Sequence, residues 1–325
     1  MQKLLRWWVQ PGQAWVSAPT LGKWGAAIVG VVVLSGSAVV ATASADSANQ
    51  TGDVQAFRGL GTWVDVYDYV PGFTQGGGPP PVSVDSVDDM HALGVKTLYL
   101  QSAQDDTRIT GATVAPKLLG AMLRRAHDRG IRVVAWYLPK FSDVAADLRR
   151  IKALASFRSK GEQFDGIALD IEWTQGVPDP GARNVALVRL AKRARQVVRD
   201  RPLGAIVLEP VLLEDVNTQY WPRFPWKKVA DKFDVWLPLA YWTNRESASG
   251  FRDGFVYADE NIRRVRKRIG DPDAAVHPIG GIANQASTED YIGFVRAAKR
   301  RDAIGWSVYD FNTTTSASWP WLRGR

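Results

Sequence analysis

Residues 164–173 read FDGIALDIEW, an apolar run that ends in two carboxylates and a tryptophan. Side chains on a β-strand alternate between two faces. The apolar positions of one face are Ile167, Leu169 and Ile171. Asp170 and Glu172 therefore share the opposite face. Their backbone positions are about 6.5–7 Å apart, so the two carboxylates can meet or share a proton.

The same kind of apolar, β-branched run recurs along the chain, each time followed by a segment with helical periodicity. The expected strands are residues 59–69, 95–103, 131–139, 164–173, 203–213, 233–243, 275–284 and 303–312. Helices are expected to start near Val84, Lys117, Val144, Ala182, Asp259 and Thr288. Gly94 and Gly130 stand where helices end and the next strand begins at once.

This alternation predicts a parallel sheet. Because eight units follow one another without a second block of sequence, we expect a single-domain (β/α)8 TIM barrel, an α/β fold. An open doubly wound sheet is the alternative. It is disfavoured because no glycine-rich phosphate loop follows the first expected strand.

In such a barrel, Gly166, Ala168, Asp170 and Glu172 face the axis, and the last two lie at the C-terminal mouth, where barrels keep their active sites. Two neighbouring acids raise one another's pKa. A carboxylic acid can then stay protonated near neutral pH and act as a general acid. A structural ion pair with an arginine from a neighbouring strand is the alternative.

Other residues at strand ends extend this candidate site. Glu209 is expected near the mouth, either as a nucleophile opposite Glu172 or as a partner that supports Glu172. Asp65 and Asp310, on the first and last strands, are further candidates at the mouth, assigned to substrate binding or, if the substrate has no acetamido group, to the nucleophile. Aromatic side chains at strands or strand ends can stack on sugar rings or simply pack in the core. Those assigned to substrate binding are Tyr137, Trp173, Trp242 and Trp306.

Composition excludes several kinds of site. The chain has no cysteine, which rules out disulfides, thiolate metal sites and cysteine nucleophiles, and it has only three histidines. We therefore expect no metal and no cofactor, and a metal-dependent phosphodiesterase is disfavoured. The net charge of +8 does not predict nucleic-acid binding, because the basic residues interleave with acids on expected helices.

The first 45 residues have the order of a secretory signal. A basic segment precedes a short apolar run at residues 25–40, and Ala43-Ser44-Ala45 is a small-x-small cleavage signal. We expect either a cleaved signal peptide or an N-terminal membrane anchor through residues 25–43, followed by a linker at 46–56 and the barrel at 57–325. The folded part is then secreted or otherwise extracytoplasmic. The sequence does not predict the oligomeric state.

Residues 165–172 resemble the strand-four signature of chitinase-type glycoside hydrolases (family 18), Asp-Gly-x-Asp-x-Asp-x-Glu. Asp165, Gly166, Asp170 and Glu172 match the signature, whereas Ala168 replaces an acid. Two short stretches are also similar to the family. Tyr241, in LAYW, resembles its Met-x-Tyr-Asp motif, and Trp306 resembles the tryptophan at the floor of its sugar pocket.

The resemblance implies a divergent, exported bacterial glycoside hydrolase that acts on a polysaccharide or oligosaccharide. Glu172 would protonate the leaving oxygen. Asp170 would orient the 2-acetamido group of the substrate, which acts as the nucleophile, and Tyr241 would hydrogen-bond that group. A non-catalytic glycan-binding barrel, like the chitinase-like lectins, is the alternative function. The retained Glu172 argues against it, and Ala168 and Trp242 argue for it.

Overall fold

The computed structural model describes residues 53–324. The expected signal or anchor, including residues 25–43, and most of the expected linker lie outside the described residues. Within the described part, no helix combines the length and apolarity that a membrane span requires.

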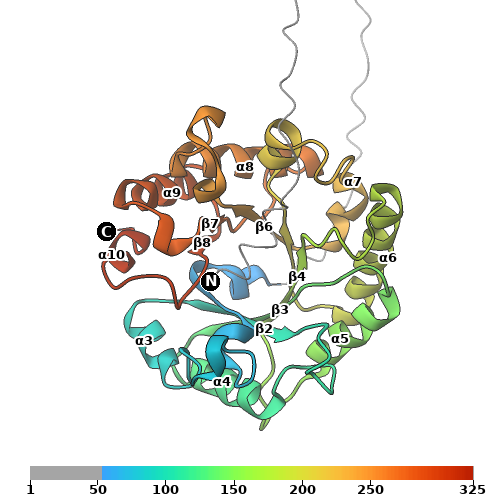
Figure 1. The fold of residues 1–325 in the computed structure, drawn as a ribbon, viewed down its shortest axis with the longest axis vertical. Coiled ribbons are helices and arrows are strands. Elements are labelled where there is room, and N and C mark those ends of the chain that lie inside the picture. Colours follow the sequence, from blue (N-terminus) through green and yellow to red (C-terminus); the bar gives the residue numbers. More distant parts are fainter. Residues whose placement is uncertain (1–52, 325) are drawn as a thin grey trace, which may run out of the picture. The chain divides into compact units, whose positions relative to one another are not determined.

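Eight parallel strands form a closed barrel, and each strand is hydrogen-bonded to its sequence neighbours (Figure 1). The strands are β1 (Gly59–Val64), β2 (Thr97–Ala103), β3 (Arg132–Tyr137), β4 (Gly166–Ile171), β5 (Leu203–Val207), β6 (Val235–Ala240), β7 (Ile279–Gly280) and β8 (Gly305–Val308). Strand β1 closes the barrel against β8, with Gly59 opposite Gly305. The prediction of a (β/α)8 barrel is confirmed.

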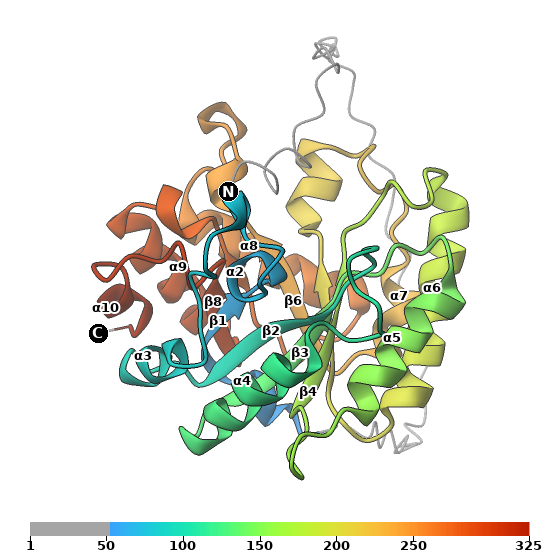
Figure 2. The same ribbon diagram turned by 60° about the horizontal axis from the view of Figure 1, so that its bottom comes forward.

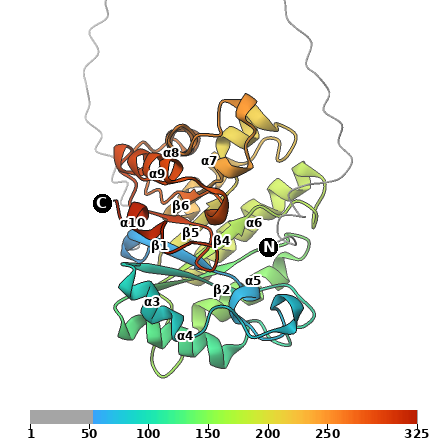
Figure 3. The same ribbon diagram turned by 60° about the vertical axis from the view of Figure 1, so that its left-hand side comes forward.

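Helices connect the strands and surround them (Figure 1). The longer ones are α3 (Ser86–Ala92), α4 (Pro116–Asp128), α5 (Val144–Ser156), α6 (Pro180–Val198), α8 (Gly254–Ile269) and α9 (Thr288–Arg300). The short ones are α2 (Val66–Tyr69), α7 (Trp226–Val229) and α10 (Trp319–Leu322). Figure 2 shows α4, α5 and α6 outside strands β2 to β4. Figure 3 shows α8 and α9 side by side.

The observed strands are shorter than the sequence suggested, for local reasons. Strand β1 stops at Val64 because the Asp65 carboxylate accepts the Tyr67 N–H and caps α2. Strand β7 shrinks to two residues. Pro278 stands directly before it and has no N–H to donate to a sheet ladder.

Phe57 fills the N-terminal end of the barrel. It ends a short 3-10 helix (Val54–Phe57) that precedes β1, and it is fully buried. Its ring lies so close to Gly166 and Gly204 that a Cβ atom on either glycine would be within 3.0 Å of it. Gly166 therefore faces the barrel axis. The alternation along β4 then points Ala168 and Asp170 inward, as predicted.

Replacing Phe57 by alanine is expected to lower the free energy of unfolding by about 3–5 kcal/mol, because it leaves a cavity between two strands that carry no side chains there. Urea unfolding of both proteins measures the change. Phe57→Leu, which keeps most of the volume, is expected to cost less than half as much. Equal stability of the alanine variant and the wild type would show that Phe57 does not fill the barrel.

Candidate active site

The carboxyl ends of β4 and β5 bring three acids together. Asp170 ends the inward-facing set of β4, and Glu172 follows the strand directly. Asp170 and Glu209 are buried, whereas Glu172 is partly exposed. Asp170 interacts electrostatically with Glu172, and Glu172 with Glu209. The sequence-predicted acids therefore converge, and Glu172 is the member of this trio with the most access to solvent.

Burial and mutual repulsion raise the pKa of these carboxyl groups. Burial first, and then repulsion from Glu172, raises the pKa of Asp170 well above its ordinary value. Burial first, and then repulsion from Glu209, raises the pKa of Glu172 to about 7. The interacting pair therefore holds at least one proton near neutral pH. A group with such a pKa can donate a proton to a leaving oxygen.

Ala168 lies below Asp170 on the same inward face and is fully buried. The Oδ1 atom of Asp170 is buried without a hydrogen-bond partner. An acid two residues earlier, as in the family 18 signature, would stand beside this atom. The departure at Ala168 thus coincides with an unsatisfied oxygen in the centre of the site.

Glu209 is enclosed behind the mouth. It has no exposed surface, and its Oε1 accepts a hydrogen bond of 3.1 Å from the Tyr257 hydroxyl of α8. The Arg245 guanidinium lies 3.6 Å from the same oxygen. Burial raises the pKa of Glu209 to about 7, although the Arg245 charge opposes the rise. This geometry suits a group that supports Glu172 better than one that attacks a substrate.

Two tyrosines complete the centre. Tyr241, directly after β6, is buried and interacts electrostatically with Glu172, Asp170 and Glu209. Tyr220 interacts with Glu172 and Glu209 as well. Tyr220 could not be expected from the sequence, because it lies in the irregular segment between β5 and β6, where no periodicity indicates its position.

A second acidic group lies at the ends of β1 and β8. Asp65 and Asp310 are buried there, as expected for mouth residues, and Asp68 of α2 joins them. Burial first raises the pKa of Asp65, to about 6, and of Asp68, to about 8. Asp68 was not expected in the site, because the sequence predicted one strand over residues 59–69, whereas β1 ends at Val64. The one-turn helix α2 brings Asp68 back beside Asp65.

Tyr309 connects the two acidic groups. Its hydroxyl donates a 2.5 Å hydrogen bond to Asp65 Oδ2. Its ring centroid lies 6.3 Å from that of Tyr241. Tyr241 also interacts electrostatically with Asp310. The acids at β4 and β5 and those at β1 and β8 thus belong to one polar centre.

Two aromatic residues assigned to substrate binding, Tyr137 and Trp242, point away from the barrel mouth. Tyr137 points to α5, where its fully buried hydroxyl donates to Asp147. Trp242 has no exposed surface and packs against Phe294 of α9. For both residues, the expectation of a sugar contact is wrong, because each side chain faces the helices.

Trp306 also faces outward. Its indole N–H donates to the Leu322 carbonyl in α10, 2.8 Å away. Inside the barrel, the neighbouring Ser307 hydroxyl lies 3.0 Å from His277 Nε2, and a Cβ atom on Gly305 would meet the same histidine. The resemblance to the tryptophan at the floor of a sugar pocket is therefore wrong for Trp306, because period-two alternation turns position 306 toward the helices.

Trp173 lies at the rim, as expected. It directly follows Glu172, is partly exposed and has the Lys140 ammonium 5.8 Å from its ring centroid. Two cavities, of about 490 and 470 Å³, lie at the opposite, N-terminal end of the barrel. Among the four aromatic residues assigned to substrate binding, Trp173 is the one that lies next to the partly exposed Glu172.

Comparison with known proteins bears on the fold. No family model and no curated protein sequence matches the chain. Among solved structures, a class V chitinase from Pseudomonas fluorescens Pf-5 is similar, with a TM-score of 0.57 and 11% identity over 82% of this chain and 98% of that chain. A glycoside hydrolase family 18 N-acetylglucosaminidase from Paenibacillus barengoltzii has a TM-score of 0.54 and 10% identity over 82% and 99%.

A family 1 β-glucosidase from Thermotoga maritima is similar at a TM-score of 0.52, with 11% identity over 78% of this chain and 88% of that chain. These likenesses show a shared TIM-barrel architecture. At such identities, the chemistry of this chain has to be argued from its own residues.

The raised pKa of Glu209 predicts a pH-dependent stability. Between about pH 4.5 and 7, the folded state binds more protons than the unfolded chain, so the free energy of unfolding falls as pH rises. Glu209→Gln is expected to reduce this fall by about 1–3 kcal/mol. Urea unfolding at several pH values measures the fall.

Asp106→Asn is the matched control. The Arg108 side chain lowers the pKa of Asp106 to about 2, so Asp106 does not titrate in this range. The free energy of unfolding of Asp106→Asn is expected to fall with pH as steeply as that of the wild type. An equally steep fall for Glu209→Gln would contradict the raised pKa.

Proposed function

We propose that the chain is an exported glycoside hydrolase that acts on a polysaccharide, with Glu172 as the general acid and Asp170 assisting. The observation that carries the proposal is the Asp170–Glu172 pair at the mouth. It combines a raised pKa with partial exposure of Glu172. The export part rests on the N-terminal sequence alone.

The enclosure of Glu209 favours a nucleophile from the substrate. A protein nucleophile must reach the anomeric carbon, and Glu209 has no exposed surface and is held by Tyr257. Asp170 and Tyr241 keep a small exposed surface, 8% and 6%, and both interact electrostatically with Glu172. We therefore favour an amino-sugar polymer whose 2-acetamido group attacks in a retaining reaction. Asp170 and Tyr241 would orient that group, and Trp173 would stack on a sugar ring.

A glycan-binding barrel without catalysis is the second candidate. It is favoured by Ala168, which stands where the family 18 signature has an acid and leaves Asp170 Oδ1 without a hydrogen-bond partner. Both candidates take the same class of ligand. They differ in whether Glu172 transfers a proton.

Glu172→Gln is expected to lower glycan hydrolysis by about 100-fold to 10,000-fold, because glutamine cannot protonate the leaving oxygen. The measurement is release of reducing ends from a panel of cell-envelope and plant glycans, with and without 2-acetamido groups. Glu246→Gln, on an exposed rim residue, is the matched control and should retain activity. Full activity of Glu172→Gln would remove Glu172 as the acid. Binding without hydrolysis by the wild type would establish the glycan-binding barrel.

The origin of the nucleophile is tested separately. A thiazoline that mimics the acetamido intermediate is expected to inhibit the active enzyme. Glu209→Gln is expected to retain part of the activity with a shifted pH profile, and added azide should not restore the rest. A covalent glycosyl adduct on Glu209, trapped with a fluorinated glycoside, would contradict the substrate-assisted mechanism.

A further inference from the structure

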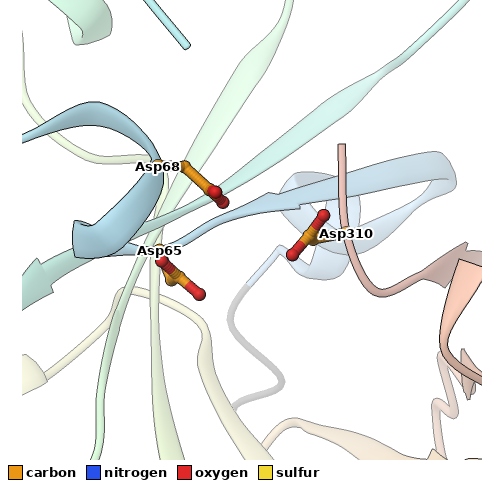
Figure 4. Close-up of side chains that lie close together, drawn as sticks. All are labelled: Asp65, Asp68 and Asp310. Atoms are coloured by element: carbon orange, nitrogen blue, oxygen red, sulfur yellow. The ribbon is translucent and has the colours of Figure 1, made fainter. Parts of the chain in front are cut away.

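Three buried aspartates meet where the barrel closes. Asp65 follows β1, Asp68 lies one turn later in α2, and Asp310 follows β8. One carboxylate oxygen of each lies within 4.8 Å of those of the other two. Figure 4 shows the three carboxylates directed toward a common space. They are 3%, 6% and 7% exposed, so water screens them poorly.

Neighbouring donors hold each carboxylate in place. Asp65 accepts from the Tyr67 N–H at 2.8 Å and from the Tyr309 hydroxyl at 2.5 Å. Asp310 Oδ1 accepts from the N–H and the hydroxyl of Thr313, both at 2.9 Å. These bonds fix the orientation of two carboxylates before any ligand arrives, which reduces the cost of ordering a site.

Asp68 has an oxygen that nothing in the described structure satisfies. Its Oδ1 accepts from the Asn312 amide at 3.1 Å, but its Oδ2 is buried and has no hydrogen-bond partner. A buried polar atom without a partner costs about 1–3 kcal/mol. Native structures rarely retain such an atom unless an ion, a water or a function accounts for it. The Asp68 carboxylate that carries this oxygen belongs to the cluster drawn in Figure 4, in which one ligand atom of each residue lies within 4.8 Å of the others.

The group has no basic partner within residues 53–324. No Lys, Arg or His side chain there forms an ion pair with these three carboxylates, whereas Glu209, on the other side of the mouth, has Arg245. Three carboxylates this close in a buried site therefore keep protons unless positive charge from outside the described residues joins them.

We infer that Asp65, Asp68 and Asp310 bind a hard divalent cation, Ca²⁺ or Mg²⁺, with Asp68 Oδ2 as one ligand. Such ions prefer carboxylate oxygens, and the cluster contains no nitrogen or sulfur ligand. The ion links the end of β1 to the segment after β8 and so fastens the first strand of the barrel to the last. Through Asp65 it also fixes Tyr309, which lies beside Tyr241.

The test is direct metal binding to the full-length chain, which does not depend on glycosidase activity. Isothermal titration with Ca²⁺, Mg²⁺ and Mn²⁺ is expected to show one site per chain in metal-stripped wild type. A metal concentration about 100 times Kd is expected to raise Tm by about 5 °C or more. Asp68→Asn is expected to weaken binding by about 100-fold and to abolish this rise.

Asp68→Asn also gives a result that does not depend on the metal. It removes a carboxyl group whose ionisation burial and its two neighbours oppose, so its metal-free form is expected to be at least as stable as metal-free wild type. Asp106→Asn, which removes an acid that Arg108 neutralises, is the matched control and should bind metal as the wild type does.

Absence of binding of all three ions to the wild type at 10-fold molar excess and at about 10 mM would overturn the site. Equal metal affinity of wild type and Asp68→Asn would overturn it too. Binding of glucosamine oligomers that Asp68→Asn abolishes, without metal binding, would instead assign the cluster to a cationic sugar. None of these outcomes changes the result expected for Glu172→Gln.

Discussion

Desolvation of carboxylates at the barrel mouth is the constraint on which the rest of this site depends. Period-two alternation on β4 places Asp170 inside the barrel and leaves Glu172 at its edge. The surrounding strands remove water from both, so their charges repel strongly and protons are retained. The chemistry of the mouth follows from this packing, because an exposed pair with the same sequence would be ionised at neutral pH.

The groups that stabilise the buried carboxylates differ between the two sides of the mouth. On the β4–β5 side, Arg245 and Tyr257 stabilise Glu209, and Glu209 in turn keeps the pKa of Glu172 high. On the β1–β8 side no such cation lies among residues 53–324, and hydrogen bonds alone orient the carboxylates. Tyr241 and Tyr309 join the two sides.

The sequence was sufficient for the barrel and for the strand-four pair, because both depend on local alternation. It was sufficient for Glu209 and Tyr241, because they lie two residues and one residue after the ends of β5 and β6 at the mouth. It failed for Tyr137, Trp242 and Trp306, since a shift of one residue turns a side chain from the axis to the helices. It also failed for Asp68 and Tyr220. These residues reach the site through a one-turn helix and an irregular loop, whose geometry depends on tertiary contacts such as the Gln101 side chain that accepts the Val66 N–H.

The central claim is that the Asp170–Glu172 pair retains a proton near neutral pH. Infrared difference spectroscopy of the carboxyl stretch across a pH titration measures this directly, with Asp170→Asn and Glu172→Gln used to assign the bands. The account predicts a protonated carboxyl band that persists above pH 6 in the wild type and is lost or shifted in both variants. Titration of every carboxyl group of the wild type below pH 5 would contradict it.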